Sequence, residues 1–192
     1  MDKQQKILDN VWKELNLGLS KSKHPFHIFS ICTINNNKPD SRYVVLRDVN
    51  KDDKVLTFHT DKRSKKIKHI EAKNSACALF YDQQQKIQLR LYGDIYEVED
   101  KLEIKERWKK SKNMSKLCYL NKYPPGEVMQ TSKEYIYDEN DLNYIENGIE
   151  NFSVINIKIS KIDWLNLNHK GHERMIISFL SNNTVKFEWV AP

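Results

Sequence analysis

The chain has 192 residues, of which 39% are hydrophobic and 30% are charged, a composition typical of a globular protein with a real core. No run approaches the roughly 18 apolar residues of a membrane-spanning helix, and the N-terminus has no apolar signal core, so we expect a cytoplasmic protein. The formal net charge of +6 would attract nucleic acid. However, many lysines alternate with acidic residues in stretches such as 100–112, as on a solvated helix face, so nucleic-acid binding is not favoured.

The first half of the chain predicts a helix followed by a mainly antiparallel sheet. An amphipathic helix is expected over about residues 2–17, because Ile7, Leu8, Val11, Trp12 and Leu15 recur at helical spacing. Alternating or β-rich segments separated by turn residues predict strands. In chain order we expect strands at 27–34, 41–49 and 55–60, a helix within 61–74, strands at 76–82 and 86–98, and a helix at 100–111.

The second half begins with the least regular part of the sequence, residues 113–150, which we interpret as an excursion over a site or an interface. Strands are expected at 152–159, 174–180 and 185–190, with a variable region near 164–173 and a turn at 181–184. Many antiparallel strands, few helices and no alternation of strand and helix indicate a β-barrel with peripheral helices. We expect residues 1–192 to form a single domain.

The cysteines and histidines do not predict a metal site. Cys32, Cys77 and Cys118 are far apart, so we expect reduced, buried thiols rather than disulfides or zinc ligands. His169 and His172 lie close together, but no carboxylate or cysteine stands at a diagnostic spacing. No nucleophile elbow, phosphate-binding glycine loop or zinc-protease motif is present. Catalytic residues therefore cannot be named, and a bound cofactor is the expected carrier of any chemistry.

Several segments could bind an anion. Arg42 and Arg47 flank an apolar strand and would project to opposite faces if that strand is regular. Either one of them contacts an interior site or a partner chain, or both are charges on an edge strand that deter aggregation. Residues 59–66 join a strand to a helix whose free N–H groups and basic residues favour a phosphate, although a solvated turn is the alternative. The polar side of the strand at 86–98 faces water, a ligand or another subunit.

In order along the chain, these segments resemble the pyridoxamine 5'-phosphate oxidase family and its relatives, the FMN-binding split barrels. RYVVLR (42–47) is similar to the family's RxVLLK strand, and LTFHTDKRSKK (56–66) to its FYTNxxSRK segment. KIQLRLYG (86–93) resembles RQVRVEG, HER (172–174) resembles HDRF, and FEWVAP (187–192) resembles the closing strand and tail. The resemblance runs from about residue 12 to the C-terminus and is closest to a divergent, oxidase-related subgroup.

The resemblance implies a Greek-key split β-barrel that forms a homodimer with FMN at the interface, and no metal. The implied FMN contacts are Arg42, Tyr43, Val44, Val45, Leu46, Arg47, His59, Thr60, Ser64, Lys65, Lys66, Gln88 and Arg174, with Gln88 reaching the flavin of the other subunit. The implied contacts to a small phosphorylated substrate are Arg47, Lys112, Ser115, Lys170 and His172. Catalytic residues stay unknown.

The departures from the family pattern concern the substrate more than the cofactor. The family's Gln-Ser pair falls near Tyr123 and Pro124 and is not recognisable. Lysine replaces arginine at Lys112 and Lys170, which removes a bidentate fork. These changes predict weaker or different substrate recognition. The resemblance itself implies an FMN-dependent oxidoreductase that takes a hydride from a vitamin B6 phosphate and is reoxidised by oxygen. The alternatives are a reductase of another small substrate, a flavin or haem carrier, and a basic barrel that binds nucleic acid.

Overall fold

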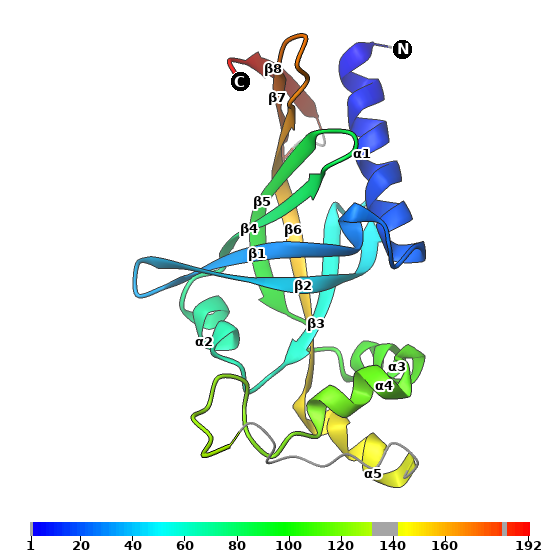
Figure 1. Cartoon of the computed structure of the whole chain (residues 1–192), viewed down its shortest axis with the longest axis vertical. Coiled ribbons are helices and arrows are strands. Elements are labelled where there is room, and N and C mark those ends of the chain that lie inside the picture. The colour runs from blue at the N-terminus through cyan, green and yellow to red at the C-terminus, as the bar shows by residue number, and fades with distance from the viewer. Residues whose placement is uncertain (1, 132–141, 182–183) are drawn as a thin grey trace.

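The computed structural model describes residues 2–131, 142–181 and 184–192. In the described residues the helices are α1 (Lys3–Ser20), η1 (Pro25–His27), α2 (Lys65–Ala72), α3 (Lys101–Lys110), α4 (Asn113–Lys116), η2 (Leu117–Tyr119), α5 (Leu142–Glu146) and η3 (Asn147–Asn151). The strands are β1 (Ile28–Asn35), β2 (Lys38–Asn50), β3 (Val55–Asp61), β4 (Ser75–Asp82), β5 (Ile87–Glu97), β6 (Phe152–Asn166), β7 (Glu173–Phe179) and β8 (Val185–Val190). Figure 1 shows both termini at one end of the molecule and α5 at the other.

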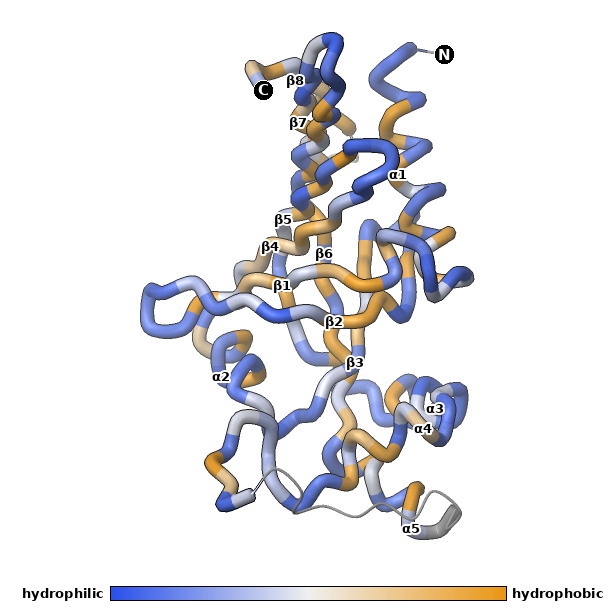
Figure 2. The backbone as a smooth tube through the Cα atoms, in the orientation of Figure 1, coloured by the Kyte–Doolittle hydropathy of each residue, from blue (hydrophilic) through white to orange (hydrophobic). Residues whose placement is uncertain are grey.

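The strands form one antiparallel sheet that closes into a barrel. Its order is β3-β2-β1-β4-β5-β6-β7-β8, and β3 also pairs with β6, which closes the first six strands. The meander β1–β2–β3, followed by β4 beside β1, is the Greek-key order. The expected Greek-key barrel with peripheral helices is therefore confirmed. Figure 2 shows hydrophobic and hydrophilic positions alternating along the barrel strands, as expected where one strand face is buried.

Along one of its edges, the long strand β6 pairs first with β3 and then with β7. Its first part pairs with β3 as far as the Lys158–Val55 pair, and its second part pairs with β7 from Lys161 onward. At the change of partner the register between β5 and β6 shifts, between Tyr92 and Gly93. A Cβ on Gly93 would lie 2.0 Å from the Lys158 backbone oxygen. Only glycine therefore allows the two backbones to approach this closely.

Two groups of buried side chains stabilise the molecule. The main core fills the barrel and is covered along one side by α1, whose Leu8, Val11, Trp12 and Leu15 are buried. The ring of Trp12 lies 6.3 Å from that of Phe179 on β7. Each of the aliphatic side chains Leu8, Val11 and Leu15 contributes about 1.5–3 kcal/mol to stability through its removal from water. The helix therefore depends on this packing rather than on its own sequence preference.

A smaller core lies under α3, η2 and η3 and consists of Val98, Trp108, Phe152 and Val154. Trp108 donates its indole N–H to Glu146 at 2.6 Å, and Lys116 donates to the same carboxylate at 2.6 Å. These contacts fix the region that the sequence left irregular, as far as it is described; residues 132–141 lie outside the described part. The excursion therefore has its own small core beside the barrel.

The expected elements agree with the structure to within a few residues, with one clear exception. The first helix extends to Ser20 rather than about residue 17, and the strand expected at 152–159 continues to Asn166. The extension was missed because Ser160 and Lys161 are both exposed at the register shift and break the alternation. Residues 182–183 of the expected turn at 181–184 lie outside the described part. No helix in the described residues is long and apolar enough to cross a membrane.

We predict that Gly93→Ala destabilises the fold by about 3 kcal/mol or more, because the added methyl group overlaps backbone atoms of β6 that cannot move independently. Gly126→Ala is the control: it strains a backbone with φ of 86°, but its Cβ meets nothing within 4 Å, so we expect a loss of about 1 kcal/mol. Urea unfolding followed by circular dichroism measures both. Equal stabilities of the two variants would contradict the close approach.

Candidate functional site

A groove runs along β2 between the barrel and the segment α3–η2. It consists of two adjoining cavities of about 620 and 400 Å³, which share Val45, Arg47, His59, Ser115 and Tyr119. Among the described residues that line them there is no aspartate or glutamate. Six lining residues carry positive charge: Arg42, Arg47, Lys66, Arg107, Lys110 and Lys112. The groove is therefore suited to an anion of small-molecule size.

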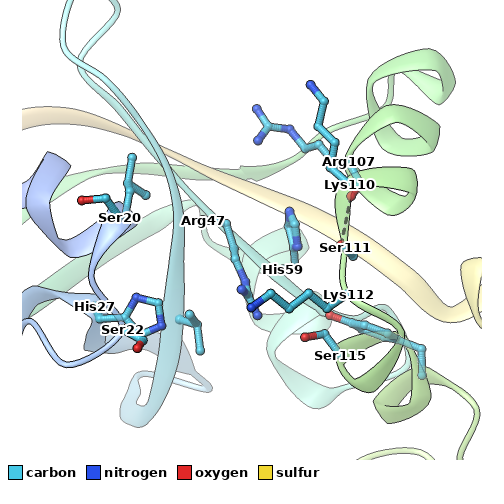
Figure 3. A pocket seen from close by; sticks show the side chains of 13 residues that line it. Ser20, Ser22, His27, Arg47, His59, Arg107, Lys110, Ser111, Lys112 and Ser115 are labelled. Atoms are coloured by element: carbon cyan, nitrogen blue, oxygen red, sulfur yellow. Dashed lines mark hydrogen bonds between the residues drawn. The ribbon is translucent and has the colours of Figure 1, made fainter. Parts of the chain in front are cut away.

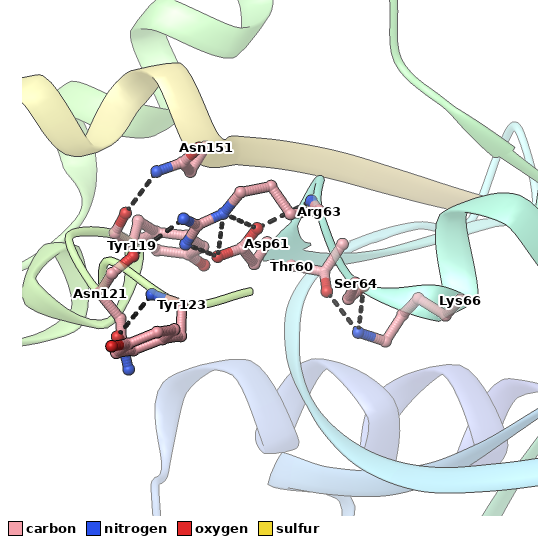
Figure 4. Close-up of polar contacts among 9 residues, drawn as sticks. All are labelled: Thr60, Asp61, Arg63, Ser64, Lys66, Tyr119, Asn121, Tyr123 and Asn151. Carbon is pink, nitrogen blue, oxygen red and sulfur yellow. Dashed lines mark hydrogen bonds and ion pairs between the residues drawn. The ribbon is translucent and has the colours of Figure 1, made fainter. Parts of the chain in front are cut away.

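One end of the groove is a cationic cradle around Lys66, the second residue of α2. Its ammonium group donates to Thr60 Oγ1 at 2.7 Å and to Ser64 Oγ at 2.8 Å (Figure 4). Burial, and next the positive charge of Arg42, lower the pKa of Lys66 to about 8. A bound phosphate would offset both effects, because it supplies the opposite charge that the buried ammonium lacks. The strand-to-helix junction thus places a half-buried cation and two hydroxyl groups where the sequence suggested an anion site.

Arg42 is held beside this cradle by contacts from its own hairpin. Its guanidinium donates to Thr33 Oγ1 at 2.7 Å and forms an ion pair with Asp40 at 2.7 Å. Thr33 is buried and also contacts His69 Nδ1 at 3.2 Å. Arg42 therefore has a fixed position, in which one carboxylate neutralises it in part.

Arg47 and His59 form the middle of the groove, where the two cavities meet. A register shift between Leu46 and Asp48 interrupts the regular alternation of β2 at Arg47. The strand is therefore not regular between Arg42 and Arg47, so the condition for their projection to opposite faces is not met, and both line one cavity. The Nε2 atom of His59 is buried and has no hydrogen-bond partner within the described residues. Burial, with Arg47 and Arg107 next, lowers the pKa of His59 to about 3, so its imidazole is neutral at physiological pH.

Two walls flank Arg47 and His59 (Figure 3). On one side the segment from α3 to α4 contributes Arg107, Lys110, Ser111, Lys112 and Ser115, and on the other side the segment from α1 to η1 contributes Ser20, Ser22 and His27. Arg107 is paired with Glu103 and Asp48, whereas the structure gives Lys110 and Lys112 no ion pair among its described residues. The first wall therefore supplies uncompensated positive charge.

Most residues predicted for the cofactor lie at the groove, but a second set does not. Arg42, Tyr43, Val44, Val45, Arg47, His59, Thr60 and Lys66 line it, as do the substrate candidates Lys112 and Ser115. Ser64 contacts Lys66, Leu46 is buried in the barrel core, and Lys65 is exposed. Gln88 on β5, Arg174 on β7, and Lys170 and His172 in the preceding loop do not line the groove of their own chain.

Arg174 instead belongs to a charge cluster on the outer side of the barrel. It donates to both oxygens of the buried Asp163, at 3.0 and 2.8 Å, and Arg90 donates to the same carboxylate at 2.5 Å. Two guanidinium groups therefore share one carboxylate. The Nε atom of Arg90 is buried without a partner among the described residues, so this cluster retains an unused donor.

Sequence reasoning missed the α1–η1 wall and part of the α3–η2 wall. His27 is placed because Gly18 lets α1 approach η1; a Cβ on Gly18 would lie 2.7 Å from the Phe26 oxygen. His27 Nδ1 then contacts the Gly18 oxygen at 2.8 Å. Tyr119 was also missed, and burial raises its pKa to about 12. No local sequence motif marks these residues, because only tertiary packing brings them to the groove.

A clasp fixes the segment after η2 to the end of β3. Arg63 makes paired hydrogen bonds to Asp61 and donates to the Asn121 backbone oxygen at 2.8 Å (Figure 4). Asn151 donates to the Tyr119 backbone oxygen at 2.9 Å. The clasp therefore holds Tyr119 and the α4–η2 wall against the cradle.

Comparison with known proteins supports the fold and identifies the family of one segment. Residues 9–99 match the family model of the pyridoxamine 5'-phosphate oxidase FMN-binding domain, which confirms the resemblance over this segment, and FMN is the cofactor of that domain. Among curated proteins no sequence matches this chain.

Solved structures with the same fold cover nearly the whole chain. A pyridoxamine 5'-phosphate oxidase-related FMN-binding protein of Nostoc punctiforme is 20% identical, with a TM-score of 0.75 and 96% coverage of both chains. PhzG of Burkholderia lata, solved with tetrahydrophenazine-1-carboxylic acid, is 14% identical, with a TM-score of 0.69 over 97% of this chain and 91% of its own. At such identities these structures establish the fold alone.

We predict that His59 makes stability depend on pH. The pKa of His59 is about 3 in the folded protein and 6.5 when unfolded. The contribution of His59 to the free energy of unfolding is therefore complete above about pH 6.5 and is lost as the pH falls toward 3. Between pH 7.5 and 5 the wild type should lose about 2 kcal/mol more unfolding free energy than His59→Gln. Urea titrations at the two pH values measure this difference. Identical losses in both proteins would exclude a buried, neutral His59.

Proposed function

We propose, from the match of residues 9–99 to the FMN-binding domain of the pyridoxamine 5'-phosphate oxidase family, that this protein is an FMN-dependent oxidoreductase. The observation that supports it most is the acid-free groove that ends in the Lys66 cradle. A flavin phosphate needs cations and hydroxyl donors at one end of its site, and its ring needs apolar side chains to pack against. Lys66, Arg42, Thr60 and Ser64 provide the first requirement, and Val44 and Val45, which line the same cavity, contribute to the second.

The polar atoms of the groove fit this cofactor. Lys66 has a lowered pKa because its charge is buried beside Arg42 without a paired carboxylate, and a phosphate would relieve that repulsion. His59 Nε2 is buried and unpartnered among the described residues, so it offers a hydrogen-bonding atom to a bound ring system. The cradle, the neutral imidazole and the adjoining apolar residues all lie on β2, β3 and α2. These elements belong to the matched segment.

FMN, when bound, supplies two-electron redox chemistry by accepting a hydride from a substrate carbon. The chain's own residues would bind and orient the reactants. Arg47, Lys112 and Ser115 all line the larger cavity, and we propose that they hold the phosphate of a small phosphorylated substrate. Because His59 stays neutral, it adds no positive charge there and can donate or accept one hydrogen bond.

We further propose that the protein acts as a homodimer. Gln88, Arg174, Lys170 and His172 are residues to which the resemblance assigns cofactor or substrate contacts, but they lie away from the groove of their own chain. We propose that a second chain brings them to the groove, as the resemblance implies for Gln88. Arg90, whose Nε lacks a partner among the described residues, lies in the same charge cluster as Arg174. This arrangement supports a contact surface on the outer side of β5, β6 and β7.

A second candidate function is the reduction or oxidation of a different small anion by the same flavin. Lysine at positions 112 and 170 loses the bidentate geometry of arginine toward a phosphate. In addition, Tyr123 and Pro124 stand where the family has its Gln-Ser pair. Lys110 and Lys112, which have no ion pair among the described residues, would accept a carboxylate as readily as a phosphate.

We predict that Lys66→Met weakens FMN binding about 10- to 100-fold, because it removes a buried charge-assisted hydrogen bond to the phosphate. Lys68→Met is the matched control: the residue is exposed on the same helix, and its loss should leave the affinity unchanged. Titration of the purified proteins with FMN, followed by flavin fluorescence, gives both dissociation constants. Equal constants for the two variants, or a wild type that retains no flavin, would contradict the site.

We predict that pyridoxamine 5'-phosphate bleaches the flavin absorption of the FMN-loaded protein under anaerobic conditions, and that oxygen restores it. Lys112→Met should raise KM about tenfold with a smaller effect on kcat, because it removes a charge that binds the substrate phosphate. Lys109→Met is the control, since Lys109 is exposed and does not line the groove. Retained flavin without bleaching would reject this substrate and favour the second candidate.

A further inference from the structure

Two of the three cysteines lie directly opposite each other on neighbouring strands. Cys32 on β1 pairs with Cys77 on β4 in the antiparallel register, although they are 45 positions apart in the sequence. Both are free and half-buried. Since directly opposed residues point to the same face of a sheet, the two side chains lie next to each other on one face of the sheet. The third cysteine, Cys118, is exposed at the groove, on the other side of β2.

The two thiols belong to a cross-strand row that continues to Tyr92 on β5 and Lys161 on β6. Tyr92 shares a hydrogen bond with Cys77, and the ammonium of Lys161 lies 4.4 Å from the centre of the Tyr92 ring. Burial raises the pKa of the Cys77 thiol, and the neighbouring Cys32 raises it further. This electrostatic effect agrees with the strand register, which places the two thiols close together.

The backbone geometry suits a disulfide between them. Opposed residues in antiparallel strands have Cα atoms about 4.5–5.5 Å apart, within the range of about 4.4–6.8 Å that disulfides require. The pairing of β1 with β4 covers only Ser30, Ile31 and Cys32 on the β1 side, so few ladder hydrogen bonds resist a small local shift. Closure needs a side-chain rotation and no rearrangement of the barrel.

We propose that Cys32 and Cys77 are a redox-active pair that closes to an intramolecular disulfide by exchange with a low-molecular-weight disulfide such as oxidised glutathione. One cysteine thiolate attacks a sulfur of the small disulfide, forms a mixed disulfide and expels one thiolate. The second cysteine attacks the protein sulfur of that mixed disulfide and expels the other. Two electrons pass from the cysteines to the small disulfide, and the two protons leave with its two thiol products.

The pair lies next to the support of the cationic cradle. Thr33, which accepts the hydrogen bond of Arg42, directly follows Cys32 and points to the opposite face of β1. The disulfide would therefore fix β1 to β4 one residue away from this contact. The proposal itself needs no flavin, so it stands or fails separately from the proposed function.

The test treats the full, folded chain with oxidised glutathione and maps the products by mass spectrometry of non-reduced peptides. We expect one cross-linked peptide pair joining Cys32 to Cys77, with the loss of two hydrogen atoms, reversed by dithiothreitol. A mixed disulfide on Cys118 shows that the reagent is active. Oxidised protein should also melt several degrees higher than reduced protein, because the cross-link restricts the unfolded chain.

Variants separate the pair from unspecific oxidation. Cys118→Ser should keep both the cross-link and the increase in Tm, whereas Cys32→Ser and Cys77→Ser should lose both. If the serine variants do not fold, the wild type and Cys118→Ser still decide. The proposal is overturned if glutathione remains attached to Cys32 and Cys77 separately, or if Cys118 alone reacts.

Discussion

The close approach of β5 and β6 at Gly93 is the constraint on which the barrel and its groove depend. At this point β6 stops pairing with β3 and begins to pair with β7, and the register between β5 and β6 shifts by one residue. The 2.0 Å between a notional Gly93 Cβ and the Lys158 oxygen leaves no room for any side chain. The shift lets one long strand both close the barrel and extend the sheet outside it. Through β3, that closure places His59 and Thr60 beside β2.

The groove is distinguished by charge rather than by apolar burial. Arg47, Lys66, Lys110 and Lys112 line it without an ion pair in the described structure, and no acidic side chain lines it there. Keeping such charges together costs free energy in the absence of an anion. Burial is the main cause of the lowered pKa values of Lys66 and His59, and the neighbouring positive charges lower both further. The lysine sheds its proton more easily, while the histidine stays neutral throughout the physiological range.

The sequence predicted the barrel well because its strands alternate. Most strands were placed within a few residues, and the order of motifs pointed to the split barrel that the structure confirms. The strand predicted at 152–159 ends too early, because Ser160 and Lys161 are both exposed at the register shift. Two exposed residues in a row interrupt the alternation from which the strand was predicted. Cys118 is exposed rather than buried, since the irregular segment that carries it covers the groove rather than the core.

Half of the residues that line the groove could be predicted from the sequence in the same way, and half could not. Arg42, His59 and Lys66 could be found because each lies within a contiguous strand or strand-to-helix motif. Ser20, His27 and Tyr119 could not, because they reach the groove through packing such as the contact of Gly18 with Phe26. The pairing of Cys32 with Cys77 was likewise hidden, since strand register between β1 and β4 cannot be read from spacing.

The central claim is that FMN occupies this groove with its phosphate in the Lys66 cradle. A crystal structure of the protein grown with FMN tests it most directly. The account predicts phosphate density within hydrogen-bond distance of Lys66 Nζ and Arg42, and a flavin ring beside His59. Density for FMN elsewhere on the barrel, or its phosphate at the Lys110–Lys112 wall instead, would contradict it.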